Sequence, residues 1–216
     1  MSPLHYPFPD LPATAQAAEV APGVHWLRMP LPFALDHINL WLLDDGDERV
    51  IVDCGYGSDE TRQAWASVLD ADPRPVTRVV VTHHHPDHVG LATWLAARNG
   101  ASIHMTLGEY LLGHAIWQQL PGYNVQDMVA QFRAHGLDDA PATALATRGN
   151  AYRRGIPELP SRYERLRHGS ILPIDGREWR VIVGYGHAPE HASLYCAELG
   201  VLISGDMLLP RISTNV

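Results

Sequence analysis

The distribution of apolar and polar residues predicts a chain that forms strands, then helices, then strands again. Short apolar runs rich in β-branched residues are typical of buried strands, and they occur at residues 24–29, 38–43, 49–53, 76–81, 102–106, 179–183, 193–197 and 201–203. Apolar residues at helical spacing predict helices at residues 59–69 and 91–97. This order of elements indicates an α/β fold in which stacked sheets carry helices on the outside.

A cluster of histidines follows the predicted strand at residues 76–81. The run His83-His84-His85-Pro86-Asp87-His88 places four imidazoles and a carboxylate on the turn that leads into the next helix. In an extended backbone alternate side chains point the same way, so His83 and His85 converge while His84 faces elsewhere. Asp87 and His88 then lie in the first helical turn. Zinc and iron are bound by His and Asp clustered on a rigid turn, which favours a metal site over a solvated polar loop.

The spacing of these residues resembles the signature of the metallo-β-lactamase superfamily, which includes glyoxalase II-like and β-lactamase-like hydrolases. Three further motifs occur in the order typical of that family, one before the histidine run and two after it. They are VDCG at 52–55, GHAPEH at 186–191 and SGD at 204–206. Ala188 and Glu190 replace the usual Thr and Gly of the second of these motifs.

The resemblance implies a fold and a set of metal ligands. The fold would be a four-layer αββα sandwich, formed by a single domain over residues 1–216. His83, His85 and His187 would hold one ion, Asp87 and His88 a second, and Asp206 would bridge the two. Two zinc ions per chain are expected, with iron or manganese as alternatives. The family usually supplies one further histidine later in the chain, and no histidine follows His191. The C-terminal part of the fold is therefore expected to be missing.

By the same resemblance, the chemistry would be hydrolysis of a small acyl substrate, such as an ester, thioester, lactone or lactam, by a metal-activated water. Asp87 would act as the catalytic proton shuttle. Asp53 would either orient a ligand histidine or cap backbone amides in its turn. Two alternatives remain: a mononuclear iron oxygenase of the persulfide dioxygenase kind, and a catalytically idle binding protein.

Residues 107–166 separate the second and third ligand motifs. Apolar residues recur at helical spacing from Tyr110 to Trp117 and from Val125 to Phe132, and the stretch from there to residue 160 is predicted as a loop. The apolar stripes either pack on the core or form a lid over the metals. In a lid, the wall of a substrate pocket would be formed by Tyr110, Trp117, Tyr123 and Tyr152. No metal is assigned to His104, His114 or His135.

Composition narrows the class of partner. The 216 residues are 46% hydrophobic and carry a net charge of −8, which suits one sizeable core and disfavours a nucleic-acid surface. Cys54 and Cys196 are expected to be buried free thiols, as in a reducing cytoplasm. Neither a signal peptide nor a membrane-spanning run is visible. We expect a small-molecule substrate, no nucleic acid, no membrane, and self-association into a homo-oligomer through an exposed sheet edge.

Overall fold

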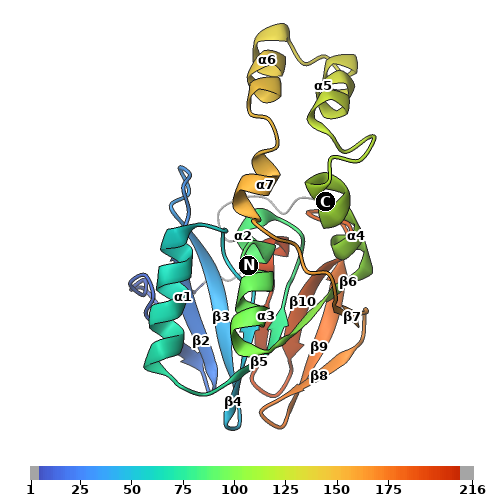
Figure 1. Ribbon diagram of the computed structural model, residues 1–216. Helices are drawn as coiled ribbons and strands as arrows, with labels where there is room; N and C mark the ends of the chain where they lie inside the picture. Colours follow the sequence, from blue (N-terminus) through green and yellow to red (C-terminus); the bar gives the residue numbers. More distant parts are fainter. Residues whose placement is uncertain (1–4, 210–216) are drawn as a thin grey trace.

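The larger of two β-sheets is formed by seven strands in the order in which they occur along the chain. The computed structural model describes residues 5–209. The strands of this sheet are β1 (Ala18–Ala21), β2 (Val24–Pro30), β3 (His37–Asp45), β4 (Glu48–Val52), β5 (Val76–Val80), β6 (Ser102–Thr106) and β7 (Glu164–Leu166). Neighbours from β1 to β4 are antiparallel, whereas β4 to β7 are parallel (Figure 1). Parallel strands need long crossover connections, and these connections contain the helices.

A smaller, antiparallel sheet packs against the larger one. Its strands are β8 (Ile171–Ile174), β9 (Arg177–Gly184), β10 (His191–Cys196) and β11 (Val201–Ile203), in the spatial order β11-β10-β9-β8. Val52 and Val80 of the larger sheet share a core cluster with Trp179, Val181 and Leu194 of the smaller one. All five are at most 2% exposed. Burying each large apolar side chain contributes about 1.5–3 kcal/mol, so this cluster holds the two sheets together.

Two helices cover the outer face of the larger sheet. α1 (Asp59–Ala71) begins after Ser58, whose hydroxyl accepts a hydrogen bond from the backbone N–H of Thr61 at 3.1 Å, as an N-cap residue does. α3 (Ala92–Asn99) ends at Gly100, whose φ of +70° is the left-handed conformation that favours glycine. Trp65 of α1 and Leu95 of α3 are fully buried in a second core cluster against the sheet. The layers are therefore helix, sheet and sheet.

The predicted sandwich of two stacked sheets is confirmed, but residues 5–209 do not form its fourth layer. Within the described residues, no helix covers the outer face of the smaller sheet. Four large side chains of this sheet are 37–41% exposed: Ile171, Ile182, Tyr195 and Leu202. The strands β1, β7 and β8 were not predicted, because their sequences, AEVA, ERL and ILPI, contain no continuous run of β-branched residues. Cys54 and Cys196 are buried free thiols, as predicted. No helix within the described residues has the length and hydropathy needed to cross a membrane.

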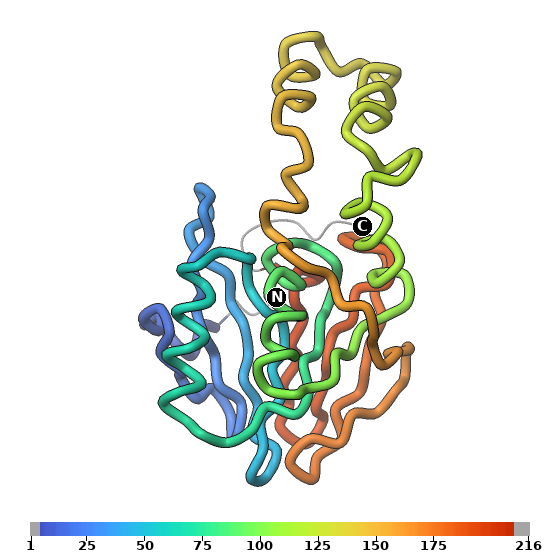
Figure 2. Tube along the Cα trace, viewed as in Figure 1, coloured from blue at the N-terminus to red at the C-terminus, as the bar shows by residue number. Residues whose placement is uncertain are grey.

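The segment between β6 and β7 is helical and partly projects from the sandwich (Figures 1 and 2). It contains α4 (Leu107–Trp117), α5 (Val125–Ala134), α6 (Asp139–Thr147) and α7 (Ala151–Gly155). We call α5, α6 and their connection, residues 125–147, the arm. The arm has a small core of its own, formed by Val125, Val129 and Ala142.

The prediction of a loop up to residue 160 is therefore wrong. The sequence of α6, DAPATALAT, is rich in alanine, which has the highest helix propensity. Its proline lies in the first turn, where proline is tolerated. The arm projects away from the sandwich (Figure 2), and its role as a lid remains a prediction.

Strand ends bring the predicted motif residues to one edge of the sandwich. Asp53 follows β4 and Thr82 follows β5, and these strands are parallel and adjacent, so their carboxyl ends meet. His187 lies in the turn between β9 and β10, and Asp206 lies in the short 3-10 helix η1 (Gly205–Met207) after β11. The backbone N–H of Ala192 in β10 donates to the carbonyl of Thr82 at 2.9 Å. This bond joins the smaller sheet to the histidine turn of the larger one.

Candidate metal centre

Three histidine rings from two separate loops converge on one point. Nε2 of His83 lies 3.0 Å from Nδ1 of His85, and Nε2 of His187 lies 3.1 Å and 3.0 Å from those two atoms. Asp206 adds a carboxylate whose Oδ2 lies 3.5 Å from Nε2 of His187. The four ligand atoms all lie within 4.8 Å of one another. Nitrogen ligands of a tetrahedral zinc ion are about 3.3 Å apart when the Zn–N bonds are about 2.05 Å, so this spacing fits one metal ion.

Burial keeps two of these histidines in the neutral form that binds metals. Burial and the neighbouring histidines hold the pKa of His83 well below its ordinary value. Burial, with the adjacent His84, lowers the pKa of His85 to about 3. A neutral imidazole keeps a lone pair on one ring nitrogen. Three rings that meet nitrogen to nitrogen cannot all donate to one another, so the cluster presents lone pairs to a cation.

A second set of donors is built around His88. Its Nε2 is buried without a hydrogen-bond partner and lies 3.4 Å from Oδ1 of Asp206 and 3.7 Å from Oδ2 of Asp87. An orphaned ring nitrogen beside two carboxylates is a polar group that a second metal ion would satisfy. The predicted pair of Asp87 and His88 is therefore brought together with Asp206.

Asp53 fixes the orientation of His88. Its Oδ2 lies 2.8 Å from Nδ1 of His88, and the same oxygen accepts a hydrogen bond from the Thr82 hydroxyl at 2.8 Å. Its Oδ1 accepts from the backbone N–H of Thr82, also at 2.8 Å. Asp53 thus does both things considered from the sequence, since it orients a histidine and caps a backbone amide. Its φ of +63° is in the left-handed region, which is a strained conformation for most side chains.

Asp206 lies between the two sets, with one carboxylate oxygen toward each. Burial would raise its pKa, but the adjacent His88 ring and the other neighbouring histidines lower it to about 2. Its backbone N–H donates to Nε2 of His191 at 3.2 Å. Next to it, Gly205 has a φ of +49°, and a Cβ there would come within 2.5 Å of the same ring nitrogen. No role was assigned to His191 from the sequence, although it ends the GHAPEH motif four residues after His187. In the structure it holds the Asp206 turn.

Sequence reasoning also missed Glu109, in the first turn of α4. This carboxylate is fully buried and accepts hydrogen bonds from Nδ1 and the backbone N–H of His84 at 2.5 and 3.0 Å, and from the backbone N–H of Glu190 at 2.7 Å. His84 does face away from the point where His83 and His85 converge, as predicted. Glu109 could not be identified from the sequence as the partner of His84, because it is a single acidic residue in an apolar helix.

The four aromatic residues considered for the substrate wall fall into two groups. Tyr110 stacks on Tyr163, and the indole of Trp117 donates to the carbonyl of Ile156, so these two rings pack on the core of the sandwich. Tyr123 and Tyr152 instead line a cavity of about 380 Å³ between α4, α5 and the chain that leads from α6 into α7. The Tyr152 hydroxyl donates to the carbonyl of His84 at 2.6 Å.

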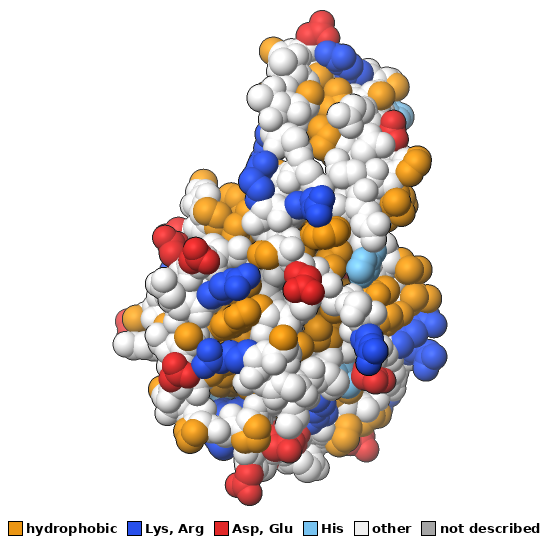
Figure 3. All heavy atoms as spheres, viewed as in Figure 1, with side chains coloured by type: hydrophobic (Ala, Val, Ile, Leu, Met, Phe, Trp, Pro, Cys, Tyr) orange, Lys and Arg blue, Asp and Glu red, His pale blue; other side chains and the backbone are white. Residues whose placement is uncertain are grey.

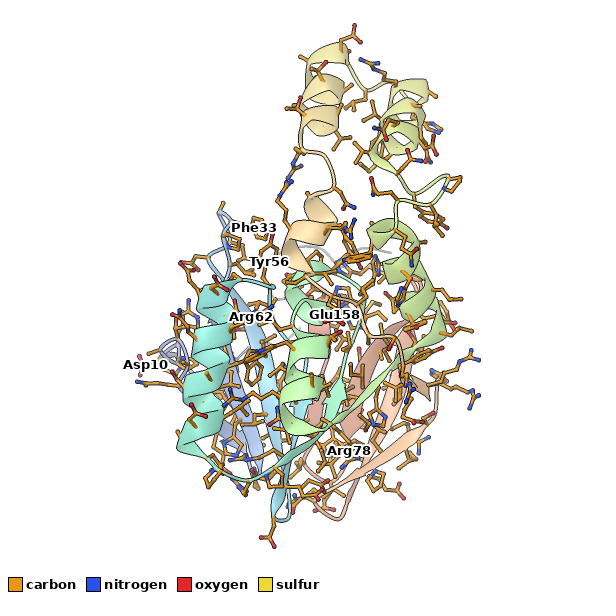
Figure 4. The ribbon with its side chains drawn as sticks, viewed as in Figure 1. Asp10, Phe33, Tyr56, Arg62, Arg78 and Glu158 are labelled. Atoms are coloured by element: carbon orange, nitrogen blue, oxygen red, sulfur yellow. The ribbon has the colours of Figure 1, made fainter. Side chains whose placement is uncertain are left out.

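This cavity is mainly apolar and lies at the base of the arm. Its apolar side chains include Ile116, Val125, Met128 and Leu145, and apolar side chains are visible between the two helices of the arm (Figure 3). Tyr152 is shared between the cavity wall and the histidine turn. Phe33 and Tyr56, whose rings meet edge to face with centroids 5.3 Å apart, lie at the end of the sandwich from which the arm rises (Figure 4).

Comparison with known proteins gives the family. The profile of the Metallo-beta-lactamase superfamily matches residues 34–216. The chain is 27% identical over 193 residues to the Probable metallo-hydrolase YqjP of Bacillus subtilis, which covers 88% of this chain and 58% of that protein. It is 24% identical over 203 residues to the Atrochrysone carboxyl ACP thioesterase of Emericella nidulans, covering 92% of this chain and 48% of that protein.

A solved structure agrees with both the sequence match and the fold. A beta-lactamase domain protein from Burkholderia ambifaria is 48% identical, with a TM-score of 0.82 over 98% of this chain and 62% of that chain. The protein described here thus spans about half to two thirds of the length of these relatives. Its motifs, its two-sheet sandwich and its profile match agree, and the chain belongs to the metallo-beta-lactamase superfamily.

Proposed function

We propose that this protein is a binuclear zinc hydrolase of small acyl substrates. The observation that carries the proposal is the convergence of two donor sets on Asp206, His83/His85/His187 on one side and Asp87/His88 on the other. A divalent ion bound there supplies Lewis-acid chemistry, polarising a substrate carbonyl and lowering the pKa of water. Hydrolysis is the reaction class that uses both effects.

The protein's own residues would hold the reactants and move the proton. Asp206 presents one oxygen to each donor set, so it fixes their separation. The Asp87 side chain is 25% exposed and lies 3.7 Å from Nε2 of His88, so it can exchange protons with solvent while facing the centre. We assign Asp87 to take the proton from the attacking water and to return it to the leaving group.

The donor set supports hydrolysis over the two alternatives. The iron oxygenase arrangement uses two histidines and one aspartate around one ion. Here three histidines and one aspartate converge, and His88 offers a further ring nitrogen. A binding protein without catalytic activity would not need metal-binding donors in this arrangement, nor a carboxylate such as Asp53 that orients His88. Buried free thiols support a reducing, cytoplasmic location.

Among acyl substrates, we propose thioesters or esters with an apolar acyl group. The cavity at the base of the arm is lined by apolar side chains, and its wall residue Tyr152 contacts the histidine turn. A cavity of this size and character suits the apolar part of a small ligand. The Emericella nidulans relative is described as a thioesterase, which is consistent with the same substrate class.

Metal content and hydrolysis, measured on the same samples, test the proposal. The wild-type protein should contain about two zinc ions and hydrolyse acyl thioesters or esters in a panel that also includes lactones and β-lactams. His85→Ala should lose metal and activity, whereas His135→Ala, a change at an exposed histidine of the arm, should keep both. Full metal content in His85→Ala would overturn the ligand assignment. One iron per chain with oxygen consumption would favour the oxygenase.

A further inference from the structure

The first turn of α4 binds both metal-ligand loops at once. Glu109 accepts the hydrogen bonds of His84, which lies between the ligands His83 and His85, and it also accepts from the backbone N–H of Glu190, three residues after His187. One carboxylate therefore joins a loop of the larger sheet to a turn of the smaller sheet.

Glu190 strengthens the same connection from the other side. Its side-chain Oε2 accepts a hydrogen bond from the backbone N–H of Gly108 at 2.7 Å, and its carbonyl accepts from the Thr106 hydroxyl at 2.8 Å. A Cβ at Gly108 would lie 3.0 Å from the Glu190 side chain, so the approach is close. The glutamate that replaces the usual glycine of this motif thus ties the His187 turn to α4.

The burial of Glu109 needs an explanation, because an unpaired charge in a protein interior is costly. Burial alone would raise the pKa of Glu109, but the hydrogen bonds from His84 and from the Glu190 amide outweigh it and hold the pKa below its ordinary value. A buried ion pair is weak evidence for a stabilising role, since apolar residues of similar volume are often as good. A role in geometry accounts better for a carboxylate whose donors all belong to ligand loops.

We propose that Glu109 is a positioning residue that holds the His83–His85 loop and the His187 turn at the separation required for a metal ion. The proposal rests on the metal centre proposed above and deepens it. Glu109 does not touch the ligand atoms. It acts through His84, which lies between His83 and His85, and through Glu190, which lies in the same turn as His187. Without it, the three ring nitrogens would lose the support that keeps them about 3 Å apart.

Cobalt(II) binding tests this inference without any assay of activity. Glu109→Ala should weaken cobalt affinity by about 10- to 100-fold, as removal of partners behind metal ligands does, and should change the visible spectrum that reports ligand geometry. Glu109→Gln keeps the shape and one acceptor oxygen but cannot accept from both loops. It should rescue part of the affinity, and it carries the test if the alanine variant aggregates.

The control is another buried charged residue far from the site. Arg49 is 6% exposed and pairs with Asp44 and Asp72. It is next to Val50 in β4, and Val50 pairs with Arg78 of β5. Arg78 lies toward the end of the molecule opposite the arm (Figure 4). Arg49→Met should lower thermal stability but leave cobalt affinity and spectrum unchanged. If the Glu109 variants behave like Arg49→Met, Glu109 is merely structural and the inference is wrong. If the wild-type protein binds no cobalt, the metal centre itself fails; if it binds cobalt but hydrolyses nothing, only the proposed reaction fails.

Discussion

Asp53 and His88, which are 35 residues apart in the chain, share a buried hydrogen bond of 2.8 Å between Oδ2 and Nδ1. Because this bond occupies Nδ1, the other ring nitrogen is directed toward Asp206 and Asp87. His88 thus has one nitrogen for the protein and one for a metal ion. Such partners of ligand histidines fix the tautomer and the ring orientation.

Asp53→Asn should therefore weaken the donor set around His88. Asparagine tolerates the positive φ of this position, so the turn should survive while the charge behind the ring is lost. We expect kcat to fall by about 10- to 100-fold and zinc content to drop toward one ion. Elemental analysis and steady-state kinetics measure both. Asp47→Asn, in the exposed turn between β3 and β4, is the control, and wild-type zinc content in Asp53→Asn would contradict the role assigned to Asp53.

Filling the cavity at the base of the arm should change substrate preference without removing metal. Met128 lines the cavity, so Met128→Trp should take up part of the cavity volume. The KM for long apolar acyl groups should then rise by about 10-fold, which corresponds to losing about 1.4 kcal/mol of apolar burial. Acetyl substrates should be hydrolysed as before. Phe132→Trp, on the same helix but 47% exposed and outside the cavity lining, is the matched control. Equal KM values for long acyl groups in both variants would show that the acyl group binds elsewhere.

Acid should destabilise the protein partly through Asp72, at the end opposite the arm. Oδ2 of Asp72 accepts hydrogen bonds from Arg74 at 2.8 Å and from Nε of Arg49 at 3.0 Å. These bonds, from Arg74 first, hold the pKa of Asp72 well below its ordinary value. A carboxyl with a lower pKa in the folded state adds stability above its unfolded pKa of about 3.9, and this contribution is lost as the pH falls toward the folded value.

Asp72→Asn should then lower the free energy of unfolding at neutral pH by about 1 kcal/mol, a figure kept small because solvent screens this partly exposed group. It should also flatten the fall in stability below about pH 4. Denaturant titrations across this range measure both effects. Asp70→Asn, at a carboxylate that is 70% exposed, should show neither. A variant with the same acid slope as the wild type would rule out Asp72 as the source.

Local pattern was enough to predict the strands that carry the ligands. A run of β-branched residues predicts β5, because this short strand is largely buried between other layers, and His83 and His85 follow its carboxyl end. The two sheets followed from the resemblance and from the order of elements. The edge strand β7, with the sequence ERL, carries no such run and is held by its parallel pairing to β6. Such a strand depends on a neighbour that the local sequence does not reveal.

The support of the site was harder to predict than the site itself. His191 and Glu109 act through residues 15 and 81 positions away. His191 lies in a recognised motif and Glu109 is a single acidic residue in an apolar helix, but neither local pattern reveals the distant partner. The helix α6 was missed for a different reason. The glycine, proline and arginine content of the stretch up to residue 160 suggested a loop, whereas the alanines of α6 and the packing of Ala142 with Val125 and Val129 of α5 favour a helix.

The two donor sets should release their ions at different rates. His83, His85, His187 and Asp206 offer four ligand atoms within 4.8 Å, whereas the set around His88 has, among the described residues, only Asp87, His88 and the shared Asp206. Zinc in proteins usually takes four ligands, with water or substrate filling one position of a catalytic site. Dialysis against a mild chelator should therefore remove one ion first and leave about one zinc per chain bound for longer. The zinc content of samples taken over time measures this.

The variant His88→Ala leaves the four-ligand set of His83, His85, His187 and Asp206 intact. This variant should bind about one zinc ion from the start, and that ion should leave at the slow rate of the wild-type protein, because none of its three histidine ligands has been changed. His187→Ala should do the reverse and lose the slowly released ion. Simultaneous release of both ions from the wild-type protein, or loss of both in His88→Ala, would mean that the two sets form one interdependent centre. The carboxylate of Asp206 would then be the coupling element, since it is the only ligand that the two sets share among the described residues.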